Sequence, residues 1–222
     1  MTTILFSLLM AASNVVHAAG YEVSLDTGVM GTSDEQWDKV QYNRSIPGAG
    51  LTMGTEISES ISLLAGFHTG TVGSIVYTTA DEDAEYVAWD EPNFHIASTI
   101  DQYSMAARWR MKLLPRLTPT VTGSAILAHG RLRMDEDIEL DGSEVELKYV
   151  SVVPGASVGA GLEYTLLYLA NKQVRINVGF EAGYTYLAPF NFKDRDSAKD
   201  PLDIGKLGMN GAHMRWSIGT RF

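Results

Sequence analysis

Two histidines of the sequence lie close to serines in the chain. His213 precedes Ser217 by four residues, and Ser62 precedes His68 by six. A serine activated by a histidine, which an acid orients, is the usual arrangement for nucleophilic hydrolysis. Neither pair forms a convincing triad, and the strand pattern described below predicts that all four side chains face the inside of the protein. The sequence therefore predicts that the chain is not an enzyme.

The acidic residues suggest metal binding at one place only. Asp137, Glu139 and Asp141 begin like a calcium-binding loop, but Lys148 occupies the position of the closing glutamate. The chain has no cysteine, which excludes thiol catalysis and thiolate metal sites. We therefore predict no metal and no other cofactor, and we interpret the acidic run as a solvated hairpin.

Charge and hydropathy narrow the class of protein. The net charge of −10 argues against nucleic acid as a partner.

The first stretch, MTTILFSLLMAASNVVHAAG, predicts a secretory signal peptide over 1–18, although no basic residue precedes its apolar core. The alternative is a buried N-terminal helix. Residues 19–222 are predicted to form one domain, in which no segment approaches the run of about 20 apolar residues that a membrane helix needs.

Alternation of apolar and polar residues with a period of two predicts a chain of strands. Short turns follow the second, fourth and sixth strands, and long connections follow the others, as is typical of transmembrane β-barrels. Asp141-Gly142 predicts that the fifth and sixth strands continue as a hairpin, and a change of apolar phase predicts a bulge near Val152-Val153. The eight predicted strands cover about 21–30, 49–57, 60–71, 99–113, 117–129, 152–166, 174–188 and 209–222.

Side-chain size predicts which face of the strands points inward. The polar face is rich in glycine and serine, whereas the apolar face carries Phe67, Trp109, Phe180 and Trp216. An eight-stranded barrel has room inside only for modest side chains, so the large residues would overpack it. We therefore expect the apolar face to meet lipid. The alternative is a soluble, lipocalin-like barrel with that face inside.

The predicted inner face carries charges of both signs. Buried charges must be paired, so the near balance of signs predicts a salt-bridged plug. A gated ion path is the alternative. The predicted lumen charges are Glu22, Asp26, Glu56, Arg108, Arg110, Lys112, Glu163, Arg175, Glu181, Arg215 and Arg221.

The last strand carries a resemblance to a known family. Met214, Trp216, Ile218 and Phe222 place apolar residues at alternate positions and an aromatic residue at the end, although Thr220 stands where an aromatic residue is common. This pattern resembles the assembly signal of bacterial outer-membrane barrels. With the other features, the chain resembles the small eight-stranded barrels of the OmpX, OmpW and OmpA membrane-domain type.

The resemblance implies an all-β, antiparallel, up-and-down transmembrane barrel with four long extracellular loops and three short periplasmic turns. It implies export to the outer membrane of a Gram-negative cell, with periplasmic chaperones and the barrel-assembly machinery as partners during biogenesis. Outer-membrane lipid and lipopolysaccharide are the expected surroundings. Two functions stay open: a structural or surface-interaction barrel whose acidic loops contact lipopolysaccharide, cells or host molecules, and a narrow porin-like channel for ions or small solutes.

Overall fold

The computed structural model describes residues 20–34, 44–76, 94–111, 113–136, 145–169, 173–194 and 206–222. No helix within these ranges has the length and hydropathy to cross a membrane. The strands are β1 (Tyr21–Gly31), β2 (Ser45–Ser58), β3 (Ile61–Val76), β4 (Phe94–Arg110), β5 (Leu117–Glu136), β6 (Val145–Leu169), β7 (Val174–Asn191), β8 (Lys193–Asp194) and β9 (Lys206–Arg221).

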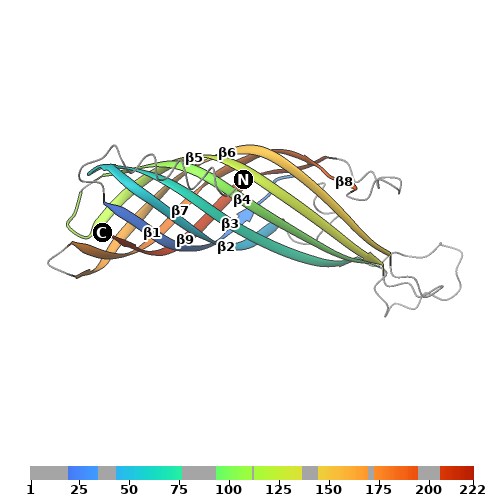
Figure 1. Ribbon diagram of the computed structural model, residues 1–222, viewed down its shortest axis with the longest axis horizontal. Coiled ribbons are helices and arrows are strands. Elements are labelled where there is room, and N and C mark those ends of the chain that lie inside the picture. The colour runs from blue at the N-terminus through green and yellow to red at the C-terminus, as the bar shows by residue number, and fades with distance from the viewer. Residues whose placement is uncertain are drawn as a thin grey trace, which may run out of the picture.

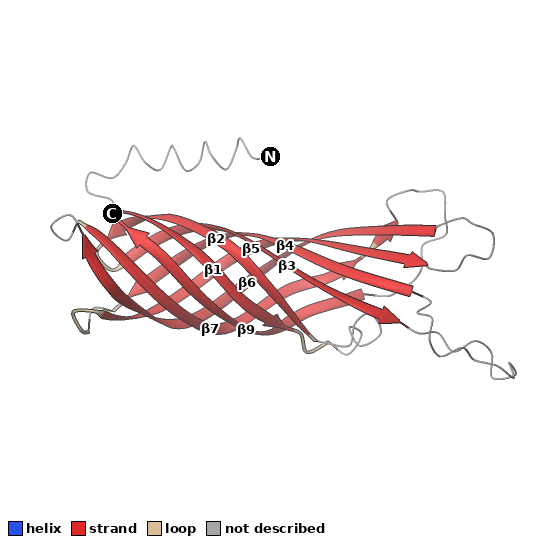
Figure 2. Ribbon diagram, turned by 90° about the horizontal axis from the view of Figure 1, so that it is seen from below, coloured by secondary structure: helices blue, strands red, loops and turns tan. Residues whose placement is uncertain are grey.

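The strands form one closed antiparallel barrel (Figures 1 and 2). Consecutive long strands pair with each other, and β9 pairs with β1 from Glu22 opposite Arg221 to Met30 opposite His213. This pairing closes the barrel, because the first and last long strands become neighbours and neither is left as an edge. The two-residue β8 follows β7 in the chain and pairs with β6.

The eight predicted strands are all present, and most of them extend further than predicted at the end of the long connections. The β5–β6 register is continuous from Leu117 opposite Tyr164 to Glu136 opposite Val145, so the predicted bulge near Val152-Val153 is wrong. The apolar phase changes there because Val153 points into a buried apolar cluster. Register shifts instead occur at Glu56/Ser58, Thr165/Leu167 and Leu187/Phe190. The predicted signal peptide and the Asp141-Gly142 turn lie outside the described residues.

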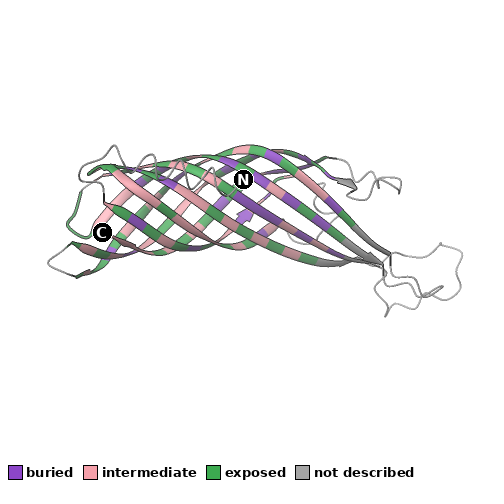
Figure 3. Ribbon diagram, in the orientation of Figure 1, coloured by how far each residue is buried: buried purple, intermediate pink, exposed green. Residues whose placement is uncertain are grey.

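The apolar face of the strands points outward. Trp109 and Trp216 are about half exposed, and the burial of residues alternates along each strand (Figure 3). Aromatic rings also pair on this outer face, with centroids 5.2 Å apart for Phe67 and Tyr103. Such a continuous exposed apolar belt fits hydrocarbon rather than water. The alternative of a soluble barrel with these side chains inside is therefore wrong.

The interior has two layers of different chemistry. The layer near the short turns is polar and charged, as the alternation predicts. The layer near the long connections is a hydrophobic cluster, which differs from the polar inner face that the alternation predicts. We call this cluster the apolar plug; its fully buried members include Ala128, Leu132, Tyr149, Leu187, Phe190, Leu207 and Met209.

Candidate functional site

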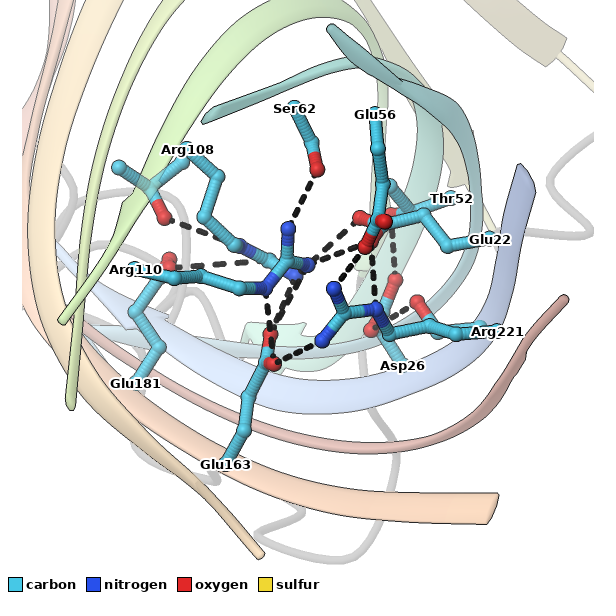
Figure 4. Close-up of polar contacts among 12 residues, drawn as sticks. Glu22, Asp26, Thr52, Glu56, Ser62, Arg108, Arg110, Glu163, Glu181 and Arg221 are labelled. Atoms are coloured by element: carbon cyan, nitrogen blue, oxygen red, sulfur yellow. Dashed lines mark hydrogen bonds and ion pairs between the residues drawn. The ribbon is translucent and has the colours of Figure 1, made fainter. Parts of the chain in front are cut away.

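Arg110 lies at the centre of the charged layer (Figure 4). It is the last residue of β4, and its guanidinium is almost fully buried. Its Nε donates to Glu163 Oε2 at 3.0 Å, and its terminal nitrogens donate to Glu22 and to the hydroxyl of Ser62. One side chain therefore links β1, β3, β4 and β6 through charge-assisted hydrogen bonds.

Arg108, two residues before Arg110 on the same face of β4, makes the second set of links. Its Nη1 donates to Glu163 Oε1 at 3.0 Å and lies 3.7 Å from Glu22 Oε1. Its Nη2 lies 4.0 Å from Glu181 Oε2 on β7. Glu181 also lies 4.0 Å from Arg215 Nη1 on β9. The cluster thus continues across β7 and β9.

Arg221 joins the charged layer at the seam between β1 and β9. It forms an ion pair with Glu56 of β2, and its Nε lies 3.8 Å from Glu22 Oε2. Its Nη1 lies 3.9 Å from Glu163 Oε2. The pairing of the first and last long strands is therefore reinforced inside the barrel by charges from β1, β2, β6 and β9.

Asp26 lies on β1, four residues after Glu22. Its carboxylate accepts hydrogen bonds from Thr52 at 2.6 Å and from Ser24 at 3.2 Å, and His68 Nε2 lies 3.9 Å away. Inward glycines leave the room that these side chains need. A Cβ at Gly50 would collide with the His68 ring.

His213 is buried among polar groups in the middle of the barrel. Its Nδ1 shares a hydrogen bond with Thr185 Oγ1 at 2.9 Å, and its Nε2 lies 3.5 Å from Glu181 Oε1. Thr185 and His213 are both almost fully buried. A hydroxyl, an imidazole and a carboxylate therefore meet inside the barrel, but a lipid on the outer face has no access to them.

Two of the predicted lumen charges stand apart from this cluster. Arg175 is exposed at the short-turn mouth, and within the described ranges it forms no ion pair. Lys112 lies outside the described residues. Four polar residues that are not among the predicted lumen charges also contribute contacts inside the barrel: Ser62, Thr52, Thr122 and His213. Their polar, inward phase on the strands was the signal that could have found them.

The apolar plug closes the interior toward the long connections. Phe190 and Phe192 stack with centroids 5.6 Å apart, and a Cβ at Gly130 would lie 2.8 Å from the ring of Phe190. Gln102 at the edge of the plug donates to the sulfur of Met30 at 3.3 Å. A cavity of about 50 Å³ lies next to Gln102 and Met30 and is also lined by His68, His213 and Arg215. This volume has room for a few water molecules.

The polar side of the interior opens toward the short turns. A small cavity of about 30 Å³ lies beside Glu22 and Arg108, and a mouth of about 460 Å³ lies beside Arg175 and Tyr168. Among the described residues no group of three or more His, Asp and Glu side chains has the geometry to hold a metal ion. What this arrangement does chemically is cross-link strands, since each arginine of the cluster contacts at least one carboxylate.

The four residues of the predicted assembly signal share the outer face of the barrel. Met214, Trp216, Ile218 and Phe222 are all about half exposed. The ring of Trp216 lies 5.6 Å from that of Phe180 on β7. Met214, Trp216 and Ile218 alternate along β9, and Phe222 directly follows the last residue of that strand.

Comparison with known proteins identifies the fold. No protein-family model matches the chain, and no curated protein matches its sequence. A major outer membrane protein of Thermus thermophilus superposes with a TM-score of 0.54 at 11% identity, over 93% of this chain and 100% of that one. The chain has the fold of an outer-membrane β-barrel.

Other outer-membrane barrels give weaker superpositions. Neisserial surface protein A matches with a TM-score of 0.47 at 13% identity, over 92% of this chain and 98% of that one. Ail of Yersinia pestis, solved with the heparin analogue sucrose octasulfate, matches with a TM-score of 0.40 at 12% identity, over 92% and 97%. At such identities the likeness concerns the fold of this outer-membrane barrel and not its activity.

Proposed function

We propose that this barrel is a closed structural and surface-interaction protein of the bacterial outer membrane. Its long connections would lie outside the cell and contact lipopolysaccharide, other cells or host molecules. The observation that carries this proposal is the apolar plug, which fills the interior at the end of the long connections. A dry apolar section of that kind is a barrier to hydrated ions.

The same proposal includes the route to the membrane. Residues 1–18 would act as a cleaved signal peptide, and periplasmic chaperones would carry the chain to the barrel-assembly machinery. Met214, Trp216, Ile218 and Phe222 would form the signal that this machinery reads. This role is supported by the exposure of all four side chains and by their place in or directly after β9, the strand that closes the barrel against β1.

A narrow channel is the competing function, and planar-bilayer recording distinguishes the two. We expect refolded wild-type protein to give no stepwise conductance above that of protein-free lipid. A double variant that thins the plug, Phe190→Ala/Leu207→Ala, should show more frequent leak events if it still migrates as a folded barrel on unboiled gels. Regular single-channel steps from the wild type would contradict a closed barrel. Equal silence from both proteins would mean that the charged layer also blocks ions, which keeps the barrel closed.

A further inference from the structure

The charged layer contains two groups of ionisable side chains, and only one of them is balanced. The group nearest the short turns pairs three arginines with three glutamates: Arg108, Arg110, Arg221, Glu22, Glu56 and Glu163. Its positive and negative charges cancel. The second group lies nearer the apolar plug, and we call it the middle group; it consists of Asp26, His68, Glu181, His213 and Arg215.

The middle group has more carboxylates than arginines. Asp26 and Glu181 carry two negative charges, whereas Arg215 supplies one positive charge. Arg108 of β4 also approaches Glu181, at 4.0 Å, but it donates to Glu163 at 3.0 Å and its charge is already balanced in the first group. With both histidines neutral, the middle group therefore keeps one negative charge without a counter-charge.

The other strands around the middle group add no charge to it within the described ranges. Thr52 of β2, Thr122 of β5 and Gly159 of β6 occupy the inward positions beside it. The side chains of the middle group have little contact with solvent. An uncompensated charge among them would be costly, because burial removes most of its hydration.

Each carboxylate of the middle group has a histidine beside it. His68 Nε2 lies 3.9 Å from Asp26 Oδ2, and His213 Nε2 lies 3.5 Å from Glu181 Oε1. The other ring nitrogen of His213 is 2.9 Å from the hydroxyl oxygen of Thr185. A protonated imidazole donates from both nitrogens, and both nitrogens of His213 face oxygen atoms that can accept.

Water can reach both histidines through a cavity inside the barrel. This cavity of about 50 Å³ is lined by His68, His213 and Arg215, among others. It has room for water, and a water molecule there can deliver or remove a proton while the barrel stays folded.

We propose that the middle group is a proton-binding site, in which one histidine is charged in the folded barrel and balances the second carboxylate. A proton on an imidazole compensates the charge and leaves both carboxylates ionised. Asp26 then keeps its role as acceptor of the hydrogen bonds from Thr52 and Ser24. Because the group joins β1, β3, β7 and β9, the proton also stabilises the seam that closes the barrel.

The proposal fixes the direction of a pH effect. In the unfolded chain a histidine is half protonated near about pH 6.5 and is essentially neutral above about pH 7.5. Above that pH the folded barrel would bind one proton more than the unfolded chain, so its stability should fall as the pH rises. One linked proton changes the folding equilibrium constant about tenfold per pH unit.

The test is urea unfolding of the refolded full chain in zwitterionic lipid vesicles between about pH 7.5 and 9. We expect the folding equilibrium constant of the wild type to fall about tenfold per pH unit. Two variants should lose this dependence for different reasons. His68→Gln/His213→Gln cannot hold the proton and should also be less stable at the lower pH, whereas Glu181→Gln leaves a middle group that is neutral without the proton.

His129→Gln is the matched control, since His129 also lies 3.9 Å from a carboxylate, that of Asp101, but outside the middle group. It should keep the full pH dependence. Nitrogen-15 NMR of histidine-labelled wild type at pH 8 needs no variant and should show an imidazolium signal. Equal wild-type stability across the pH range, an unchanged slope in either middle-group variant, loss of the slope in His129→Gln, or only neutral imidazoles at pH 8 would overturn the proposal.

Discussion

Glu163 shows at the residue scale how the charged layer works. It receives hydrogen bonds from Arg108 and Arg110, and Arg221 lies 3.9 Å away. A pair of this kind contributes little over an apolar substitute, because burying the charges is costly. Removing one partner is different, since it leaves the remaining charges buried without compensation.

Glu163→Gln should therefore destabilise the barrel strongly. We expect a loss of about 3–5 kcal/mol in the free energy of unfolding, measured by urea titration of the refolded protein in lipid vesicles. Arg116→Gln, at an exposed position in the β4–β5 turn, is the control and should change stability by less than about 0.5 kcal/mol. Equal stability of the two variants would show that the interior charges are hydrated.

The apolar plug allows a second comparison of single residues. Phe190 is fully buried inside the barrel, whereas Phe180 is exposed on the outer face. Phe190→Ala should cost about 3–5 kcal/mol, because it leaves a cavity that the rigid barrel cannot collapse. Phe180→Ala should cost clearly less, since lipid chains fill the space. Urea unfolding of both variants in the same vesicles checks the difference, and a larger cost for Phe180→Ala would contradict the burial of Phe190 inside the barrel.

At the scale of the element, β9 divides its residues between two environments. Met214, Trp216 and Ile218 lie on the outer face, while His213 and Arg215 contact Glu181 inside. The strand is also the seam partner of β1. Substitutions on its two faces should therefore have different consequences.

Trp216→Arg places a charge on the outer face of β9. The expected cost is about 2–4 kcal/mol near the membrane midplane and less toward the interface. Arg215→Ala on the inner face removes one arm of the Glu181 contacts and should leave membrane insertion intact. Heat-modifiable gel migration after refolding measures both. Loss of folding for Arg215→Ala but not for Trp216→Arg would mean that the two faces of β9 are reversed.

Phe222 tests the proposed assembly signal separately from stability. We expect Phe222→Ala to reduce the amount of folded barrel in cell envelopes more than it lowers the stability of the refolded protein, because assembly would recognise the strand before closure. Thr220→Ala, which leaves the apolar alternation unchanged, is the matched control. Normal envelope levels of folded Phe222→Ala would refute the signal.

At the scale of the whole molecule, the barrel is closed, polar inside at one end and apolar inside at the other. Short turns join the strands at the end that holds the charged layer, and long connections join them at the end that holds the apolar plug (Figure 1). This asymmetry gives the proposed orientation a direct test. A broad-specificity protease added to intact cells should cut within 77–93 or 137–144 and leave a membrane-protected remainder. Cutting at Ser58-Glu59 in intact cells would reverse the orientation.

Local pattern was sufficient for the strands and their lipid face. The apolar side chains around Trp109 and Trp216 occur at every second residue, and in a strand this spacing places them on one face. Their volume then shows that this face is the outer one, because an eight-stranded barrel has room inside only for modest side chains. The inward phase of Arg108, Arg110 and Glu163 followed from the same alternation. These features are local, so the sequence by itself determined them.

Only the tertiary structure decided which charges meet and where the interior turns apolar. Arg110 and Glu163 lie 53 residues apart, and their contact depends on the stagger of strands around the closed barrel. Phe190 reaches the apolar plug because the β7–β9 register shifts after Leu187, which breaks the alternation. Register, closure and depth join distant parts of the chain, and a one-dimensional period contains no information about them.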